Sequence, residues 1–127
     1  MKIKKPEIEG KVWGYEEKII NGKYCGKKLH LAQGYRSSMH RHWKEETFYI
    51  EKGKVYLELE NSSGEIEGAV LSPFDIVHIL PDRNHRFSGL ENSIIIEFST
   101  SDTESQRTTL SEKIPDFERW RRNILKS

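Results

Sequence analysis

Polar and hydrophobic residues alternate along most of this chain, with the period of a β-strand rather than that of a helix. The pattern is cleanest over residues 54–60, where Val55, Leu57 and Leu59 share one face. An Asn-Ser-Ser-Gly cluster at 61–64 then leads into another segment of the same kind, which predicts a β-hairpin. The same criteria predict further strands at 24–31, 46–52, 65–71, 75–80, 85–88 and 93–99. Many short strands divided by turn residues indicate an all-β sandwich or barrel.

Only the C-terminal end of the sequence has a helical pattern. Pro115 and Asp116 suit the first turn of a helix. Phe117, Trp120 and Ile124 follow at i, i+3 and i+7 of that helix, so they share one face. We expect this apolar face to pack on the barrel or on a partner subunit.

The length of 127 residues suffices for one domain with a core and is too short for two ordinary domains. We therefore expect a single domain over 1–127, with a barrel core of about 12–100 and a short C-terminal helix of about 115–125. Hydrophobic residues make up 35% of the chain, which fits a small barrel with a solvated exterior.

Charge balance and the lack of long apolar segments argue against two classes of partner. The 21 basic and 20 acidic residues leave a net charge of +1, whereas nucleic-acid-binding proteins usually carry a basic excess on one face. No apolar stretch is long enough to span a membrane, and the N-terminal segment lacks the apolar region of a signal peptide. Cys25 is the single cysteine, so no intrachain disulfide can form, and we expect a cytoplasmic protein.

Three potential metal ligands lie close together at even spacings. His40 and His42 are two residues apart, so both project from the same face of a strand. Glu46 follows at another even offset and can point the same way if the strand resumes after a short bend. Two imidazole nitrogens and a carboxylate oxygen suit a divalent first-row metal. His85, just past a proline turn between two predicted strands, is the candidate for a fourth ligand.

The histidines also have interpretations that involve no ligand. A lone His-x-His pair is a weak signal, and the four candidate ligands could be polar filler inside a barrel. His30 and His78 lie within predicted strands among Leu and Ile, so a hydrogen-bonded structural role is the default for them.

Two more polar residues are candidates for the same site. Lys44 has the parity of His42 and Glu46, so it either faces the site or is a solvated loop lysine. Glu97 is the only carboxylate in the apolar segment 93–99. Burying a carboxylate is costly unless the group is paired or serves a site. Glu97 therefore lies either in a cavity or on the solvent face of an edge strand.

These segments together resemble the cupin superfamily. The first cupin motif is G-x5-H-x-H-x3-E-x6-G, and every fixed position of it is met here by Gly34, His40, His42, Glu46 and Gly53. The resemblance implies an all-β, double-stranded β-helix (jelly-roll) barrel that holds one divalent metal ion.

The second cupin motif, G-x5-P-x-G-x2-H-x3-N, matches only in part. His85 takes the histidine position, but Phe74, Leu80, Asp82 and Gly89 stand at its other fixed positions. These departures concern turn residues, so they affect the expected loop geometry more than the expected ligand.

A narrower resemblance connects the chain to small sugar-active cupins, which include D-lyxose isomerase-like enzymes and the cupin modules found beside sialic-acid synthase domains. It is carried by Lys-Val-Trp-Gly-Tyr-Glu at 11–16, Tyr-Cys-Gly-Lys at 24–27, His-x-His-x-Lys-x-Glu-Thr at 40–47 and Glu-x-Ser-Thr at 97–100. In that group an acidic residue and an Arg tend to follow the last string, and Glu104 and Arg107 could take those places.

The narrower resemblance implies a metal-dependent isomerase that interconverts an aldose and a ketose through an enediol. It implies a monosaccharide substrate and manganese as the commonest metal, with iron, cobalt, nickel or zinc as alternatives. Carried over by position, the metal ligands are His40, His42, Glu46 and His85. The residues that both bind the substrate and take part in catalysis are Lys44 and Glu97, and a further substrate-binding residue is Arg107.

Two other functions stay open at this point. Three histidines and a glutamate also suit the iron and oxygen chemistry of a dioxygenase, which an apolar, aromatic-lined pocket would favour. A non-catalytic cupin that binds a metal and a carbohydrate is the second, because no lid elements are evident in so short a chain. We also expect a homodimer, since a small barrel leaves edge strands and apolar surface to cover, around residues 12–20 and Trp120.

Overall fold

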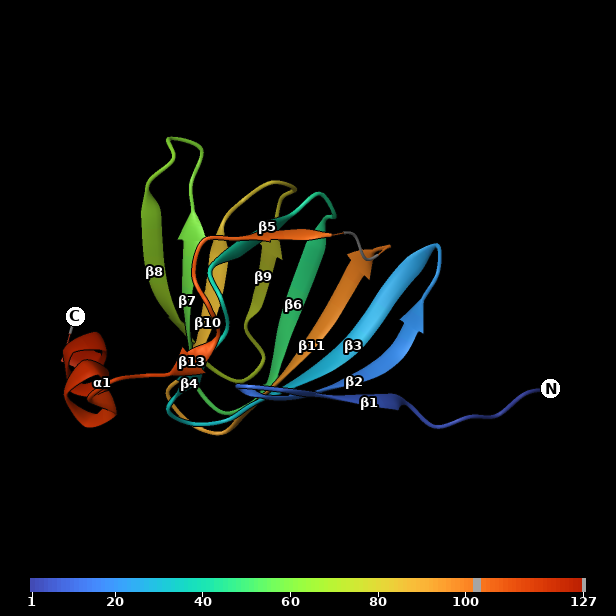
Figure 1. The fold of residues 1–127 in the computed structure, drawn as a ribbon, viewed down its shortest axis with the longest axis horizontal. Coiled ribbons are helices and arrows are strands. Elements are labelled where there is room, and N and C mark those ends of the chain that lie inside the picture. Colours follow the sequence, from blue (N-terminus) through green and yellow to red (C-terminus); the bar gives the residue numbers. More distant parts are fainter. Residues whose placement is uncertain (102–103, 127) are drawn as a thin grey trace.

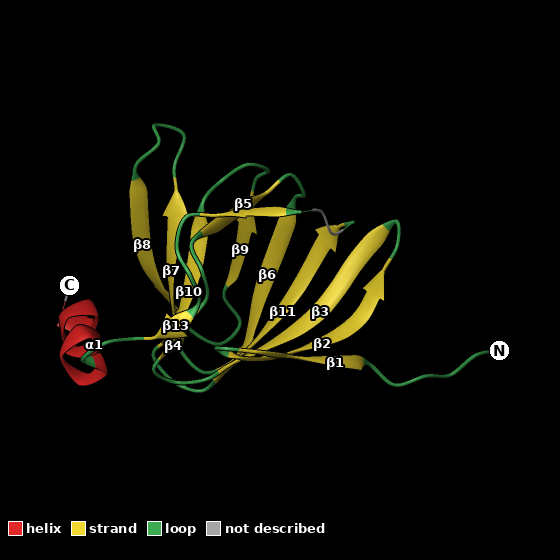
Figure 2. Cartoon of the chain, viewed as in Figure 1, coloured by secondary structure: helices red, strands yellow, loops and turns green. Residues whose placement is uncertain are grey.

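The computed structural model describes residues 1–101 and 104–126, which form two β-sheets and one helix (Figures 1 and 2). The first sheet has six strands, in the order β1 (Glu7–Lys11), β2 (Gly14–Asn21), β3 (Tyr24–Leu31), β11 (Ser93–Thr100), β6 (Glu46–Lys52) and β9 (Ile76–Ile79). The second sheet comprises β4 (Tyr35–Arg36), β5 (His40–His42), β7 (Val55–Glu60), β8 (Ile66–Leu71), β10 (His85–Gly89), β12 (Ser105–Arg107) and β13 (Glu112–Lys113). Every pairing between described strands is antiparallel.

The hydrophobic core lies between the two sheets. Phe48 and Ile50 of β6 and Ile95 of β11 meet Val55 of β7 and Phe87 of β10, and all are buried. The rings of Phe48 and Phe87 pack edge to face with their centroids 4.8 Å apart, a favoured arrangement of two aromatic rings. These side chains occupy alternate strand positions, as the period of two in the sequence predicts.

Most of the longer strands lie where the sequence predicts them, but β2, with eight residues, was not among the strands predicted from the alternation pattern. The segments predicted at 24–31 and 46–52 are β3 and β6, and the predicted hairpin around 61–64 joins β7 to β8. The two sheets extend at both ends beyond the barrel core expected at about 12–100. β1 adds an edge strand before it, and β12 and β13 complete the second sheet after it. β12 and β13 have three and two residues, too few to show a period, and β1 is almost entirely exposed.

The two proline-turn positions where the second cupin motif has glycine keep a glycine-like backbone. Phe74 and Asp82 have φ angles of 79° and 62°, in the left-handed region that glycine adopts without strain. The loop geometry that the substitutions put in question is therefore retained, at the expense of local backbone strain. In the first motif, Gly53 has a φ of 90°, and a Cβ there would lie 2.4 Å from the carbonyl oxygen of Asn92.

The C-terminal helix α1 (Phe117–Lys126) lies outside the barrel beside the second sheet (Figure 1). Trp120 packs edge to face against Tyr56 of β7, with ring centroids 5.9 Å apart. Phe117 lies against Gly34, where an added Cβ would be 3.7 Å from its ring. The predicted apolar face therefore packs on the chain's own barrel. No helix in the described part of the chain is both long enough and apolar enough to cross a membrane.

Candidate metal centre

Three histidines meet at one end of the barrel interior. β5 carries His40 and His42, which project from the same face because they are two residues apart. β10 pairs with β5 so that His85 lies directly opposite His40. One ring nitrogen from each of the three lies within 4.8 Å of the other two. The tertiary structure thus brings together residues that are more than forty positions apart in the sequence.

Backbone carbonyls orient two of the imidazole rings. Nδ1 of His40 lies 2.8 Å from the carbonyl oxygen of Ser38, and Nδ1 of His85 lies 2.9 Å from that of Arg83. A carbonyl oxygen only accepts hydrogen bonds, so each Nδ1 carries the proton and donates it. Each Nε2 is then left with its lone pair, the arrangement usual for a metal-binding imidazole.

Burial holds these histidines in the neutral form. Desolvation, reinforced by His40 and Lys44, lowers the pKa of His85 from 6.5 to about 4. Desolvation also lowers the pKa of His40, with smaller contributions from Arg107 and Lys44. Both rings are therefore uncharged at neutral pH, and only the uncharged ring can bind a metal.

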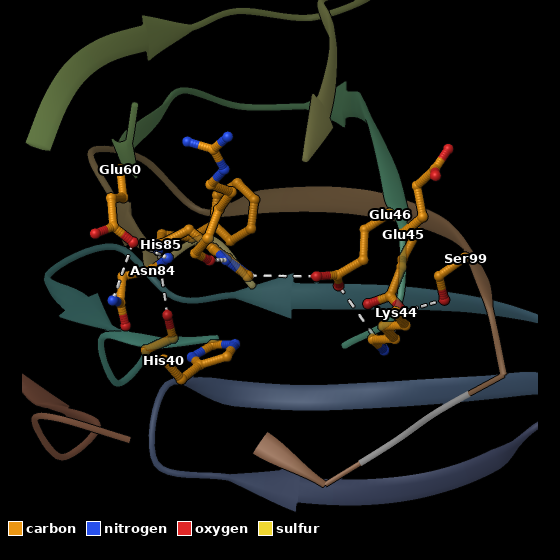
Figure 3. A network of polar contacts seen from close by, with 12 residues as sticks. His40, Lys44, Glu45, Glu46, Glu60, Asn84, His85 and Ser99 are labelled. Carbon is orange, nitrogen blue, oxygen red and sulfur yellow. Dashed lines mark hydrogen bonds and ion pairs between the residues drawn. The ribbon is translucent and has the colours of Figure 1, made fainter. Parts of the chain in front are cut away.

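Glu46 lies at the edge of this histidine cluster, at the start of β6 (Figure 3). Its Oε1 is 3.5 Å from Nε2 of His85, and its Oε2 is 3.8 Å from Nζ of Lys44. The side chain is almost fully buried and faces the cavity, as the spacing predicts. Its assignment as the fourth ligand remains a prediction, because the mutually close group consists of the three histidines.

The donor set fits a divalent transition metal. Three imidazoles with an adjacent carboxylate are ligands that manganese, iron, cobalt, nickel and zinc all accept. The site lies inside the barrel, so its donors have little competition from bulk water. A bound ion would supply Lewis-acid polarisation of a substrate oxygen.

A buried ion pair adjoins the histidine cluster. Nζ of Lys44 donates a hydrogen bond of 2.9 Å to Oε2 of Glu97, and the hydroxyl of Ser99 donates one of 2.8 Å to the same oxygen. The Lys44 and Glu97 side chains are only 2% and 5% exposed. Lys44 is therefore not a solvated loop residue, and Glu97 does not face solvent on an edge strand, since β11 lies between β3 and β6.

All seven predicted site residues line a single cavity of about 680 Å³. Arg107 of β12 is among them, because β12 pairs with β5 and places Arg107 opposite His40. The same cavity is also lined by two buried charged residues that the site prediction omitted, Glu16 of β2 and Lys27 of β3. Lys27 could have been found, because it shares the face of Leu29 and Leu31 in a predicted strand and is the only charge there.

The two remaining histidines lie on the outer face of the first sheet. His30 stacks on Tyr15 with ring centroids 4.1 Å apart, and its Nε2 lies 2.6 Å from Oε1 of Glu17. His78 lies beside Thr47 and Glu45 on a solvent-exposed surface. Neither lines the cavity, and both have hydrogen-bond partners on this outer face.

No protein-family model and no curated protein matches this sequence. Solved structures do resemble the fold, and several are of oxalate decarboxylase. A structure of the Bacillus subtilis enzyme at pH 4.6 matches with a TM-score of 0.71 and 15% identity, over 81% of this chain and 30% of that chain. A second, from work on the Mn(II) centres of the Bacillus subtilis enzyme, has a TM-score of 0.70 and 15% identity, over 83% and 30% of the two chains. A third, from work on substrate binding and reaction specificity in oxalate decarboxylase, has a TM-score of 0.73 and 13% identity, over 80% and 30%.

The chain has the cupin fold. It spans about 30% of the length of these oxalate decarboxylase chains, and identities of 13–15% make the likeness one of fold alone. The cupin fold expected from the two motifs is therefore confirmed, while the bound metal ion and the narrower resemblance to sugar isomerases stay predictions. What the cupin does must be argued from its own cavity.

Proposed function

We propose that this protein is a metal-dependent sugar isomerase that interconverts an aldose and a ketose. The observation that carries the proposal is the buried Lys44–Glu97 ion pair beside the histidine cluster. A carboxylate and an ammonium group next to a metal are what a proton transfer between two adjacent carbons requires. His40, His42 and His85, with Glu46, would hold one divalent ion, for which we favour manganese.

Each residue of the ion pair has a separate role in this proposal. Both hydrogen bonds from Lys44 and Ser99 go to Oε2 of Glu97, so we assign proton transfer to Oε1. Glu97 would take a proton from one carbon of the open-chain sugar and return it to the neighbouring carbon, through an enediol. Lys44 would stabilise the negative charge that develops on the substrate oxygen. The bound metal would polarise the carbonyl and hydroxyl oxygens at the same two carbons.

The polar walls of the cavity support a sugar over an apolar substrate. Lys44, Glu97 and Arg107 all line it, so a hydroxylated ligand would find both donors and acceptors. The aromatic side chains Phe48 and Phe87 also line it, beside His85. A dioxygenase would be favoured by walls that were apolar throughout.

The proposal is tested by loading the purified protein with manganese and incubating it with a set of pentoses and hexoses. We expect at least one aldose to give a ketose, and the activity to disappear when a chelator removes the metal. Oxalate belongs in the same screen, because the structural relatives include oxalate decarboxylases. A screen without ketose formation in manganese, cobalt, nickel or zinc would instead support a non-catalytic metal- and carbohydrate-binding cupin.

The metal assignment has its own test. His42→Ala should lower the bound metal measured after purification, whereas His78→Ala, on the outer surface, should leave it unchanged. Equal metal contents in the two variants would contradict the site.

A further inference from the structure

The cavity continues past Glu97 to a second group of charged side chains on the first sheet. Lys27 of β3 is the direct neighbour of Glu97 of β11, and Lys18 of β2 is the next residue in the same row. Glu16 lies two residues along β2 from Lys18, on the same face and opposite Leu29, and so is diagonal to Lys27. Neighbouring strands are about 4.8 Å apart, so the β2 residues lie roughly 10 Å from Glu97. The cavity therefore has two polar ends, joined by the inner face of one sheet.

Glu16 and Lys27 are both buried in the cavity wall. Each residue is only 9% exposed, and Nζ of Lys27 lies 3.7 Å from Oε2 of Glu16. That separation exceeds the 2.7–3.2 Å or so of a hydrogen bond. Among the described residues, no group donates a hydrogen bond to this buried Oε2. The two charges are thus close enough to neutralise each other and far enough apart for both to contact a third group.

Stability alone does not account for this pair. Desolvation of two buried charges offsets most of their attraction, so a buried ion pair is often no more stabilising than apolar side chains of similar size. Leu29 and Leu31 on the same face of β3 show that apolar residues fit this wall. The pair also faces the cavity that holds the candidate metal centre.

We propose that Glu16 and Lys27 form a second binding subsite, which holds the neighbouring hydroxyl groups at the far end of a neutral sugar or alditol. The choice of ligand class rests on the proposed function, since the near end of the same molecule would lie at the histidine cluster. A hydroxyl group donates a hydrogen bond to the carboxylate and accepts one from the ammonium group. Two hydroxyls on adjacent carbons would satisfy both charges at once.

The surrounding charges favour a neutral ligand over a phosphorylated one. Glu9 lines the same end of the cavity, and its carboxylate binds Lys11 at 2.6 Å and Lys18 at 3.3 Å. Lys11 also lies 3.8 Å from Glu16. The lysines here are therefore matched by carboxylates, which would repel a phosphate group.

Alternation along the strands supplies matched controls. Glu17 and Lys28, the next residues after Glu16 and Lys27, face the opposite side of the sheet. Glu17 contacts His30, and Lys28 lies 3.4 Å from Glu51 on the outer surface. Identical substitutions at these two positions change the same charges without touching the cavity.

The test uses the double variant Glu16→Gln with Lys27→Met, which neutralises both charges and leaves neither one buried alone. Glycerol, erythritol, xylitol and mannitol are titrated by calorimetry into the full-length protein in the presence of manganese. We expect wild-type affinity to rise with alditol length, because longer chains reach the second subsite. The double variant should lose this rise, binding xylitol about 10- to 100-fold more weakly, as expected for lost hydrogen bonds to charged groups. The Glu17→Gln with Lys28→Met control should bind xylitol as the wild type does.

Three results would overturn the subsite. The first is a wild-type affinity that does not rise with alditol length, and the second is a rise that persists in the double variant. The third is that glycerol phosphate binds more tightly than xylitol and that this tighter binding depends on Lys27. A double variant with an unchanged thermal transition removes misfolding as a cause, and the single variant Glu16→Gln gives a second measurement. The readout needs no turnover. Absence of ketose formation by the wild type would therefore contradict the isomerase proposal and leave the alditol result standing. Failure of the alditol test would contradict the subsite and leave the isomerase proposal standing.

Discussion

The interior of this barrel has an apolar half and a polar half, and the same strands build both. On β6, Ile50 lies in the core and Glu46 at the histidine cluster; on β11, Ile95 and Glu97 are divided in the same way. All four residues are 4% exposed or less. Equal burial therefore has different origins in the two halves. Removal from water stabilises the apolar residues, whereas the charged ones need partners to offset their desolvation.

The difference shows what each half contributes. The apolar half holds the two sheets together and needs only side chains of the right size and shape. The polar half lowers stability unless its groups are paired, so its residues are best explained by chemistry. Perturbed and buried titratable groups in a cavity are the usual mark of a functional site.

The largest expected effect is on turnover. Glu97→Gln should lower kcat about 10²- to 10⁴-fold on any sugar that the wild type converts, because an amide cannot accept the substrate proton. Bound metal and the fold should be retained, since the amide keeps the shape of the carboxylate and Lys44 still has Glu46 at 3.8 Å. Full activity in this variant would show that another group is the base. Glu17→Gln, on the outer face of the first sheet, is the matched control.

The next largest effect is on stability, and it separates the two halves directly. Lys44→Met should cost about 3–5 kcal/mol in the free energy of unfolding, because Glu97 is left buried without its partner. Adding Glu97→Gln should restore most of that loss. Ile50→Ala should cost about 2–5 kcal/mol, with no second substitution expected to restore it. Denaturant unfolding measures all three, and a double variant as unstable as Lys44→Met alone would contradict the ion-pair account.

A pH dependence should follow from His85. Its pKa is lowered to about 4 in the folded chain from an ordinary 6.5, so the unfolded chain binds more protons between those two values. The free energy of unfolding is therefore not reduced by His85 above about pH 6.5, and it falls as the pH drops toward 4. The total decrease should be about 3 kcal/mol for the metal-free protein. Unfolding of the chelator-treated protein at several pH values would measure it. His85→Gln should flatten the profile, and His78→Gln should not.

The smallest effect on the fold should come from the outer surface of the first sheet. Tyr15, in the segment 12–20 expected to form the dimer, is 39% exposed there and Phe98 of β11 is 58% exposed, and we propose that this face is covered in a homodimer. Phe98→Lys should yield a monomer by light scattering, with unfolding of the monomer changed by less than about 0.5 kcal/mol. A wild-type protein that is already monomeric at micromolar concentration would contradict the dimer.

Local signals made the long strands and the ligand spacing predictable. A period of two places His40 and His42 on one face of β5, whereas Lys44 lies in the bend after β5 and Glu46 begins a strand of the other sheet. The short strands β12 and β13 could not be found in this way, because they form only where β5 and β4 present edges for pairing. Glu16 was missed for a related reason: its strand has charges on both faces, so its sequence does not show which face is buried.

The sequence alone determined the cupin motifs, the order of the long strands and the residue types available for a metal. These depend on contacts between near neighbours in the chain and on side-chain chemistry. Only the tertiary structure decided that His85 lies opposite His40, that Lys44 pairs with Glu97 across 53 positions, and that Glu16 and Lys27 share their cavity. Such pairings depend on strand register and on which sheet face is buried, and both are set by packing of the whole barrel rather than by any local segment.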